Sequence, residues 1–526
     1  MTEHDPSSEV GCRAHCCGGG HPTSQTEGLS RRGFLGGMGG AAIGGAALAG
    51  LSWAAVAAAE QDAEVAPARK PLMVKPVLVY STPQRRPQSS WRSWGGIETQ
   101  EQAEAEQRRI AGELEQLRQQ ADFPVEFLPV ALVRTPQEAD AVDLATADTI
   151  LLYAAGGPQT ALEALASKGK DVVFFVRWKS GPVYLWYEIV SPRLLRKHTD
   201  SLQLQSLDDS DIVVDSQDEI LWRLRALCGL KNTRGCKILA VGGPGAWAQP
   251  SEKRAALTET LAKNWGFEIE TINYDDLGKL IGAARADAAA VARAKAKADA
   301  YLQIPNTTLE TERHFLDDAM LLDGVFRGLM QTSGCSALTI NSCMGTIMKY
   351  AETSACMTLS TLNDAGFLAF CESDFVVIPA GVLLASIAGR PMFLNDPTYP
   401  HAGIITLAHC TAPRKLDGKT LEPARILTHF ESDYGAAPKV EMRIGQKVTN
   451  IIPDFAISRY VGLAGEIVEA PFRPICRSQI DIRFTCDSRE LAQRMPGFHW
   501  MTIYGDYLRE AGYALRRLKV EWETLA

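Results

Sequence analysis

The sequence predicts an α/β fold with two parallel-sheet α/β domains followed by a β-rich carboxy-terminal domain that resembles an antiparallel barrel. Short apolar runs alternate with helical stretches up to about residue 230, and the same alternation restarts near Asn232. From about residue 400, short alternating segments follow one another, as in an antiparallel sheet. The 526 residues, 46% hydrophobic and 22% charged, have a globular composition, which excludes disorder over most of the chain.

The net charge indicates which classes of partner the chain can bind. The chain carries 54 Lys and Arg against 62 Asp and Glu, a net charge of -8, and has no long basic block. A large phosphate-binding surface is therefore not expected, and we predict no nucleic-acid partner. Small molecules or further copies of the chain are the expected partners.

The first 59 residues have the features of an export signal. Arg31 and Arg32, in SRRGFLGG, precede a Gly- and Ala-rich apolar stretch that ends in small residues at Ala59. This segment resembles a twin-arginine signal, which implies contact with the twin-arginine translocase and a periplasmic or otherwise exported protein. An uncleaved segment would instead leave a membrane anchor. Residues 60–74 are expected to be a polar linker.

Nine cysteines follow the predicted signal, and no two of them form a CxxC pair. An odd number without such pairs argues against a complete disulfide framework and against a thiolate zinc site. We therefore expect most of them to be buried apolar thiols.

The first α/β domain is predicted over residues 75–232. Its expected strands lie in the segments KPVLVYS, PVEFLPV, DTILLYA and KDVVFFVRW, and a charged helix is expected from Gln100 to Gln120.

The second α/β domain is predicted over residues 233–398. It begins with the strand CKILAV, and the GGPG turn after it lacks the third glycine and the acidic partner of a dinucleotide fingerprint, so we interpret it as a plain turn. A helix closed by Gly266, a strand in FEIETINY and one long Ala-rich helix over residues 275–302 are expected next. A further strand is expected in SALTIN.

The most informative stretch is DAGFLAFCESDF. It predicts a strand that ends at Cys371 and a helix from about Phe375 to Ala388, closed by Gly389, after which PMFLND is the next strand. Such a βαβ unit would place Glu372 and Asp396 on neighbouring strands about 4.8 Å apart, at the same edge of the sheet. One divalent ion, Mn²⁺ or Mg²⁺, could then contact both carboxylates. The alternative is that the acidic residues after Cys371 cap the helix and Asp396 starts a turn.

Residues 399–526 are predicted to form the β-rich domain, closed by a final helix over residues 505–525. Two of its histidines follow or precede apolar segments from which an imidazole can reach the same sheet edge. His409 follows GIITLA, and His499 lies in MPGFHWMTIYGDY. Both are candidates for the metal site, although a lone histidine is more often an ordinary polar residue.

The segment from about residue 335 to residue 507 resembles the L-fucose isomerase and L-arabinose isomerase superfamily of metal-dependent aldose–ketose isomerases. The resemblance rests on the motifs INSCMG, DAGFLAFCESDF, FLNDPTY, LAHCTAPRKL, HFESDYGAAPKVEMRIGQKVT, CRSQIDIRF and HWMTIYGDY. It implies that Glu372, Asp396 and His499 bind Mn²⁺, with His409 as a ligand or as a neighbour of one. It also implies a homo-oligomer, either a trimer or a hexamer.

The resemblance further implies a reaction and a substrate class. Glu372 and Asp396 would move a proton between C1 and C2 of an open-chain sugar, through a cis-enediolate whose charge the metal stabilises. Asn341, where family members usually carry Lys or Gln, is a candidate for a hydrogen bond to a sugar hydroxyl.

Three residues of SSWRSWGG suit the face of a sugar ring, in the same site or in that of a neighbouring subunit, although a core or surface role stays open for each of them. These residues are Trp91, Arg92 and Trp94.

Two other functions stay open at this point. A catalytically silent carbohydrate-recognition protein could keep the scaffold, and export favours that alternative because sugar isomerases normally serve cytoplasmic catabolism. A related metal-dependent epimerase or lyase could use the same enediolate chemistry.

Overall fold

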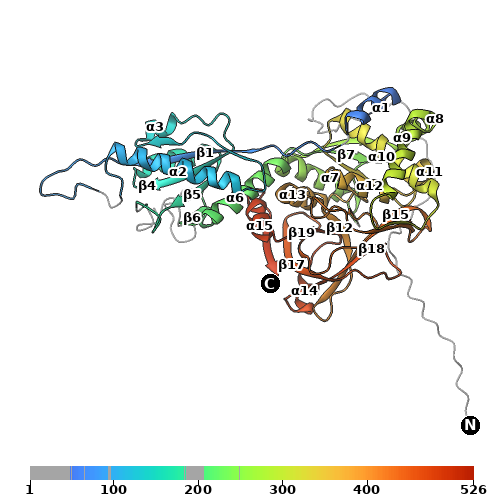
Figure 1. Ribbon diagram of the computed structural model, residues 1–526. Helices are drawn as coiled ribbons and strands as arrows, with labels where there is room; N and C mark the ends of the chain where they lie inside the picture. The colour runs from blue at the N-terminus through green and yellow to red at the C-terminus, as the bar shows by residue number, and fades with distance from the viewer. Residues whose placement is uncertain are drawn as a thin grey trace, which may run out of the picture. The chain divides into compact units, whose positions relative to one another are not determined.

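The computed structural model describes Leu48 and residues 50–525, except residues 64, 93–95, 183, 185–206 and 248. The predicted fold class is confirmed at the level of its main layers: two parallel sheets with helices are followed by a closed, mainly antiparallel barrel (Figure 1). Most of the predicted export signal, residues 1–47 and 49, lies outside the described residues.

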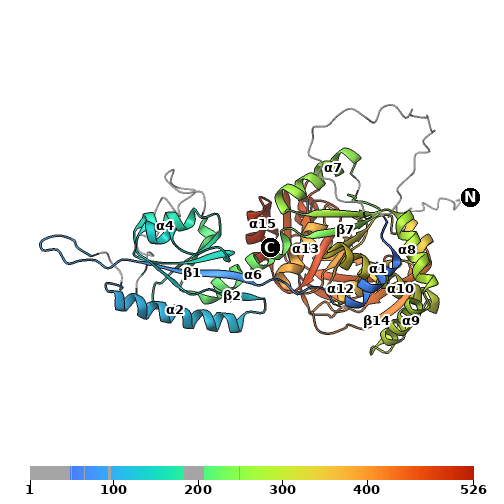
Figure 2. The same cartoon turned by 90° about the horizontal axis from the view of Figure 1, so that it is seen from above.

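The first sheet is parallel throughout, in the order β2-β1-β4-β5-β6, and β3 also pairs with β1. Its strands are β1 (Leu72–Tyr80), β2 (Val125–Phe127), β3 (Ala131–Val133), β4 (Thr149–Ala155), β5 (Asp171–Val176) and β6 (Ile212–Val214). The helices are α2 (Gln100–Gln120), α3 (Pro136–Asp140), α4 (Gln159–Ala166) and α6 (Gln217–Thr233). Helices α2 and α4 lie on opposite faces of the sheet (Figure 2), which explains why β4 is buried along its whole length.

The second sheet is also parallel, in the order β11-β10-β7-β8. Its strands are β7 (Lys237–Val241), β8 (Glu268–Ile272), β10 (Ala337–Ile340) and β11 (Leu368–Phe370). Its helices are α7 (Ser251–Thr260), α8 (Tyr274–Ala286), α9 (Ala288–Leu302), α10 (Arg313–Ser333), α11 (Thr346–Ala351), α12 (Cys356–Asp364) and α13 (Ile378–Ala388). Every residue of α13 is buried, so this helix is a core element and not a surface layer.

The barrel closes through the strand order β16-β19-β12-β13-β18-β17, because β17 also pairs with β16. Its strands are β12 (Phe393–Pro397), β13 (Ile404–His409), β16 (Lys447–Pro453), β17 (Arg459–Glu469), β18 (Ser478–Arg483) and β19 (Trp500–Tyr504). Strand β20 (Glu521–Leu525) adds to β17 in parallel. A small sheet joins β14 (Ala424–His429) to β15 (Tyr434–Val440) and to β9 (Thr307–Leu309), a strand that precedes α10 in the chain.

One prediction about this topology is wrong. The strand that carries Asp396 does not lie beside the strand before Glu372, since β12 pairs antiparallel with β13 and β19 in the barrel. The prediction assumed that a strand after a helix returns to the sheet that the chain left. Here the buried helix α13 instead connects the second sheet to the barrel, where β12 has a hydrogen-bonding partner on each side.

Two helix predictions are also corrected. The long helix over residues 275–302 is two helices, because Asp287 ends α8 and accepts hydrogen bonds from Ala289 N and Ala290 N as the N-cap of α9. The final helix is α15 (Leu508–Arg517), and the residues after it form β20. Val520, just before β20, and Leu525, its last residue, are buried, and β20 covers the edge of β17.

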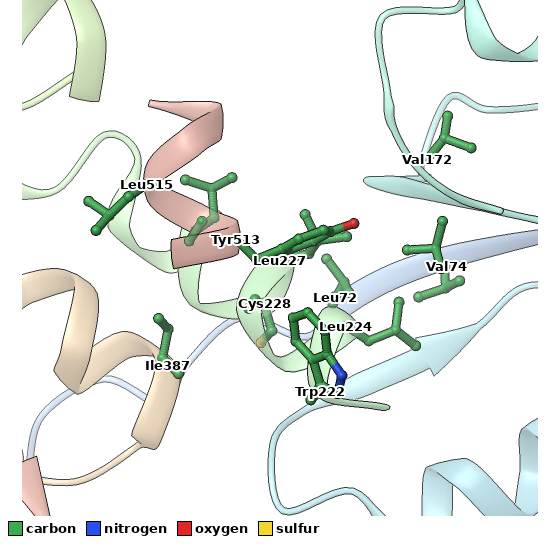
Figure 3. Close-up of a cluster of buried hydrophobic side chains, with 14 of the residues drawn as sticks. Leu72, Val74, Val172, Trp222, Leu224, Leu227, Cys228, Ile387, Tyr513 and Leu515 are labelled. Atoms are coloured by element: carbon green, nitrogen blue, oxygen red, sulfur yellow. The ribbon is translucent and has the colours of Figure 1, made fainter. Parts of the chain in front are cut away.

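A continuous apolar core links α6 to β1, α13 and α15. Leu224, Leu227 and Cys228 of α6 belong to the same cluster of buried side chains as Leu72 of β1 and Ile387 of α13 (Figure 3). Burial of side chains of this size contributes about 1.5–3 kcal/mol each to folding. Helix α6 is therefore a shared element that fixes α13 against the first sheet.

An amino-terminal helix, α1 (Trp53–Asp62), packs against α10. Val56 is fully buried, and Trp53 Nε1 donates to Asp287 Oδ2 at 3.1 Å. This helix spans Ala59, the predicted end of the export signal. None of the helices among the described residues has the length and hydropathy needed to cross a membrane.

The contact of α6 with α13 can be tested at Gly229. A Cβ atom there would lie 2.3 Å from Ile387 Cγ1 and 2.9 Å from Ile387 Cα. We expect Gly229→Ala to destabilise the protein by about 1–3 kcal/mol, the usual cost of overpacking a core, although alanine favours helix. Gly112→Ala in α2 is the matched control, since nothing lies within 4 Å of its Cβ position. Thermal unfolding followed by circular dichroism should show a lower midpoint for the first variant alone; equal midpoints for the two variants would contradict the packing argument.

Candidate metal centre

The chain leaves β11 through a strained turn at Glu372. Glu372 and Ser373 have φ angles of 63° and 48°, in the left-handed region that L-residues avoid. The GGPG turn after β7 holds this segment: Gly245 N donates to Ser373 O and Phe375 N donates to Gly245 O, both at 3.1 Å. A turn that the sequence marks as plain thus fixes the backbone that carries Glu372.

Four side chains from the second sheet and the barrel converge beyond this turn. His499 Nε2 lies 3.4 Å from Glu372 Oε2 and 3.2 Å from Asp396 Oδ1, and His409 Nε2 lies 3.7 Å from Glu372 Oε1. The barrel register explains part of this arrangement, because Asn395 pairs with Trp500 and thereby brings Asp396 beside His499. His409 ends β13, the strand on the other side of β12.

Asp374 orients His499, a role that the sequence analysis did not identify. His499 Nδ1 lies 2.7 Å from Asp374 Oδ2, and the other oxygen of Asp374 accepts hydrogen bonds from Trp247 N and Val376 N at 3.1 and 3.2 Å. The pair is buried, with 1% exposure for each residue. Because a carboxylate at Nδ1 favours a proton on that nitrogen, a neutral His499 presents its Nε2 lone pair to Glu372 and Asp396. The alternative that the acidic residues cap the following helix is wrong, since Val377 is the N-cap of α13 and no side chain caps this helix.

His409 has a polar partner of its own. Its Nδ1 lies 3.0 Å from Thr411 Oγ1, and the ring is 4% exposed. A hydroxyl can donate or accept a hydrogen bond, so this contact fixes the ring plane but permits either tautomer.

The site stabilises positive charge. Burial alone would raise the pKa of Glu372, but the nearby imidazoles of His409 and His499 outweigh burial and lower it. Burial favours neutral imidazole at His499, yet the hydrogen bond to Asp374 and the nearby carboxylates of Asp396 and Glu372 raise its pKa well above the ordinary value. The pKa of His409 is raised against burial chiefly by the nearby carboxylate of Glu372. The carboxylates around His499 therefore favour a bound cation at this site.

The donor set fits a divalent metal ion. His499 Nε2 and Asp396 Oδ1 are buried and have no hydrogen-bond partner, and ligand atoms of Glu372, His409 and His499 all lie within 4.8 Å of one another. Donors that bind one ion at about 2.0–2.2 Å are separated by distances of this size. Imidazole nitrogens with carboxylate oxygens suit several divalent metals, so the geometry supports a metal ion without selecting its identity.

Asn341 lies at the same sheet edge as Glu372. It follows β10, and the register that pairs Thr339 with Phe370 brings Asn341 level with Glu372. Its backbone N donates to Val241 O at 2.8 Å, and its carbonyl accepts from the Tyr274 hydroxyl.

Trp91 and Arg92 of the first domain do not lie at the candidate metal centre. Arg92 forms an ion pair with Glu98 at 2.8 Å, and its guanidinium lies 5.4 Å from the Trp91 ring centroid. In the described part of the chain, neither residue contacts the four converging side chains. Trp94 lies outside the described residues.

Comparisons with known proteins identify no relative. The chain matches no protein-family model, and a search of curated proteins finds no match. The function must therefore be argued from the arrangement of the residues.

The role of Asp374 gives a prediction about metal affinity. Asp374→Asn keeps the size of the side chain but removes the charge that holds the Nδ1 proton of His499, so we expect a 10–100-fold weaker affinity for Mn²⁺. Glu259→Gln in α7 is the matched control, because this carboxylate is exposed. Isothermal titration with Mn²⁺ measures both variants. Wild-type affinity in Asp374→Asn, with an unchanged melting temperature, would show that Asp374 does not position the ligand.

Proposed function

We propose that the chain is a metal-dependent sugar isomerase that interconverts an aldose and a ketose. The observation that carries this proposal is the approach of two carboxylates, from Glu372 and Asp396, to one buried imidazole nitrogen of His499 at 3.4 and 3.2 Å. His499 Nε2 and Asp396 Oδ1 are buried and make no hydrogen bond, as expected of metal ligands. Resemblance to the L-fucose and L-arabinose isomerases supports the same activity.

The two carboxylates can divide the proton transfer between them. One carboxylate beside C2 accepts the C2 proton of the aldose, this proton passes to the second carboxylate beside C1, and the resulting acid delivers it to C1, while a proton passes from the oxygen on C2 to the oxygen on C1. The Glu372 side chain is 14% exposed and that of Asp396 is 32% exposed, so Glu372 is the better shielded from competing water. A bound divalent ion supplies charge stabilisation to the two sugar oxygens during this transfer. The chain's own task is to hold both carboxylates beside neighbouring carbon atoms.

We propose Mn²⁺ as the metal, with Mg²⁺ as the second choice. The ligands would be Glu372, Asp396 and His499, with His409 either as a fourth ligand or as the group that orients Glu372. Imidazole ligands favour transition metals over Mg²⁺, whereas carboxylates accept both.

The proposal extends to assembly and location. We infer a homo-oligomer, a trimer or hexamer, in which Trp91, Arg92 and Trp94 can serve the site of a neighbouring copy. We also infer export through the twin-arginine pathway from the Arg31-Arg32 segment.

The assignment of Glu372 predicts a large loss of turnover on a conservative change. Glu372→Gln keeps the shape of the side chain but removes the base, and we expect kcat to fall by about 10²–10⁴-fold. The assay is conversion of a panel of aldoses to ketoses in the presence of Mn²⁺. Glu126→Gln in β2, an exposed carboxylate, is the control and should keep wild-type turnover.

Measurements of turnover, sugar binding and deuterium exchange separate this function from the alternatives. Activity that survives complete removal of metal by a chelator, or wild-type turnover in Glu372→Gln, would refute the mechanism. Sugar binding without exchange of the C2 proton for solvent deuterium would indicate a carbohydrate-recognition protein. Deuterium incorporation without ketose formation would indicate an epimerase or a lyase.

A further inference from the structure

A second group of metal-ligating atoms lies beside the candidate metal centre. The sulfur atoms of Cys343 and Cys371 and a carboxylate oxygen of Glu372 all lie within 4.8 Å of one another. Cys343 is 8% exposed and Cys371 is 4% exposed. Neither thiol is used in the proposed proton transfer.

Parallel pairing brings these two cysteines together. Strands β10 and β11 are neighbours, with Thr339 opposite Phe370, and both cysteines follow the carboxyl ends of these strands. Left-handed backbone at Ser342, with φ 56°, and at Glu372 bends both chain segments just beyond the sheet. The two sulfur atoms therefore lie within 4.8 Å of each other. Because the two cysteines follow separate strands, they form no CxxC pattern from which the pair could be predicted.

Tyr274 anchors the segment that leads to Cys343. The Tyr274 hydroxyl donates to the carbonyl of Asn341, two residues before Cys343, and the Tyr274 ring stacks on Tyr350 with ring centroids 6.2 Å apart. Gly242 permits this approach, since a Cβ atom there would lie 2.5 Å from Tyr274 Cε2. An apolar surrounding strengthens the attraction between thiolates and a cation.

The geometry points to a second metal site made of Cys343, Cys371 and Glu372, and we propose that it binds a thiophilic divalent ion of the zinc class. Two thiolates and one carboxylate supply three ligands, which leaves the fourth tetrahedral position open. Thiolate sulfur selects zinc over the harder Mg²⁺ and Mn²⁺. This proposal departs from the expectation of no thiolate site, which rested on the lack of a CxxC pair.

Glu372 belongs to both groups of donors. Its two oxygens face different partners in the first group, since Oε1 approaches His409 and Oε2 approaches His499. A carboxylate can bridge two ions about 3.5–4 Å apart, as in two-metal sites. The second site does not depend on the isomerase activity, because Cys343 and Cys371 take no part in the first.

Cobalt binding tests the second site directly. Co²⁺ replaces zinc in tetrahedral sites, and sulfur ligation gives an intense near-ultraviolet charge-transfer band that nitrogen and oxygen ligands do not give. We expect the reduced full-length protein titrated with Co²⁺ to show this band, and Cys343→Ala/Cys371→Ala to lose it. The control is Cys236→Ser/Cys335→Ser, which alters the two buried thiols directly before β7 and just before β10, at the opposite edge of the same sheet.

A further variant separates this proposal from the first one. His499→Gln should remove Mn²⁺ binding at the candidate metal centre but keep the sulfur band. The double alanine variant, Cys343→Ala/Cys371→Ala, should instead keep Mn²⁺ binding at wild-type affinity. Retained Mn²⁺ binding also shows that the double variant is folded. Absence of the sulfur band in the wild-type protein, or its persistence in the double alanine variant, would overturn the thiolate site and leave the isomerase proposal untouched. A Cys343–Cys371 disulfide that persists under reducing conditions would overturn it as well.

Discussion

The hydrogen bond between Asp374 and His499 is the contact on which the candidate centre depends. Asp374 follows the strained turn beyond β11, and His499 immediately precedes the barrel strand β19, so this 2.7 Å contact joins the second sheet to the barrel. It sets the ring plane of His499 and thereby the position of Nε2 between Glu372 and Asp396. Both partners are buried, and breaking one half of such a pair leaves an uncompensated charge, which is costly. The site and the attachment of the barrel therefore share one interaction.

The backbone around this contact is arranged to support it. Left-handed residues cost about 1–3 kcal/mol each, so the turn at Glu372 and Ser373 requires compensation elsewhere. The backbone of Gly245, from the loop after β7, supplies two hydrogen bonds to the segment, and the buried helix α13 continues directly from it. Helix α6 in turn packs on α13 through Gly229 and Ile387. A rigid scaffold of this kind keeps ligands in place without the ion having to organise them.

The layers and several helix boundaries could be predicted from periodicity, because burial on one or both faces leaves a repeating pattern in the sequence. Helix α2 begins and ends at the predicted residues, Gln100 and Gln120. The meeting of Glu372 with Asp396 was predicted from a βαβ unit that does not exist, since β12 belongs to the barrel. Both carboxylates approach His499 Nε2, but from a connection that local spacing could not show, because strand pairing is decided by partners far away in the chain. Asp374 was beyond such reasoning for the same reason: its function depends on a histidine 125 positions later.

The position of Cys343 beside Cys371 could not be predicted from sequence spacing either. A search for closely spaced pairs finds metal sites built within one turn, but Cys343 and Cys371 are neighbours only because β10 and β11 pair in parallel.

The packing of α1 restricts where the predicted export signal could be cleaved. Val56 is fully buried against α10, and a Cβ atom at Gly328 would lie 2.2 Å from its carbonyl oxygen, so α10 is shaped to receive α1. Removal of the chain up to Ala59 would expose this surface, whereas a cut before Ser52, the N-cap of α1, would leave the helix whole. Packing thus favours retention of α1 in the folded protein, even if the predicted twin-arginine segment before it is removed.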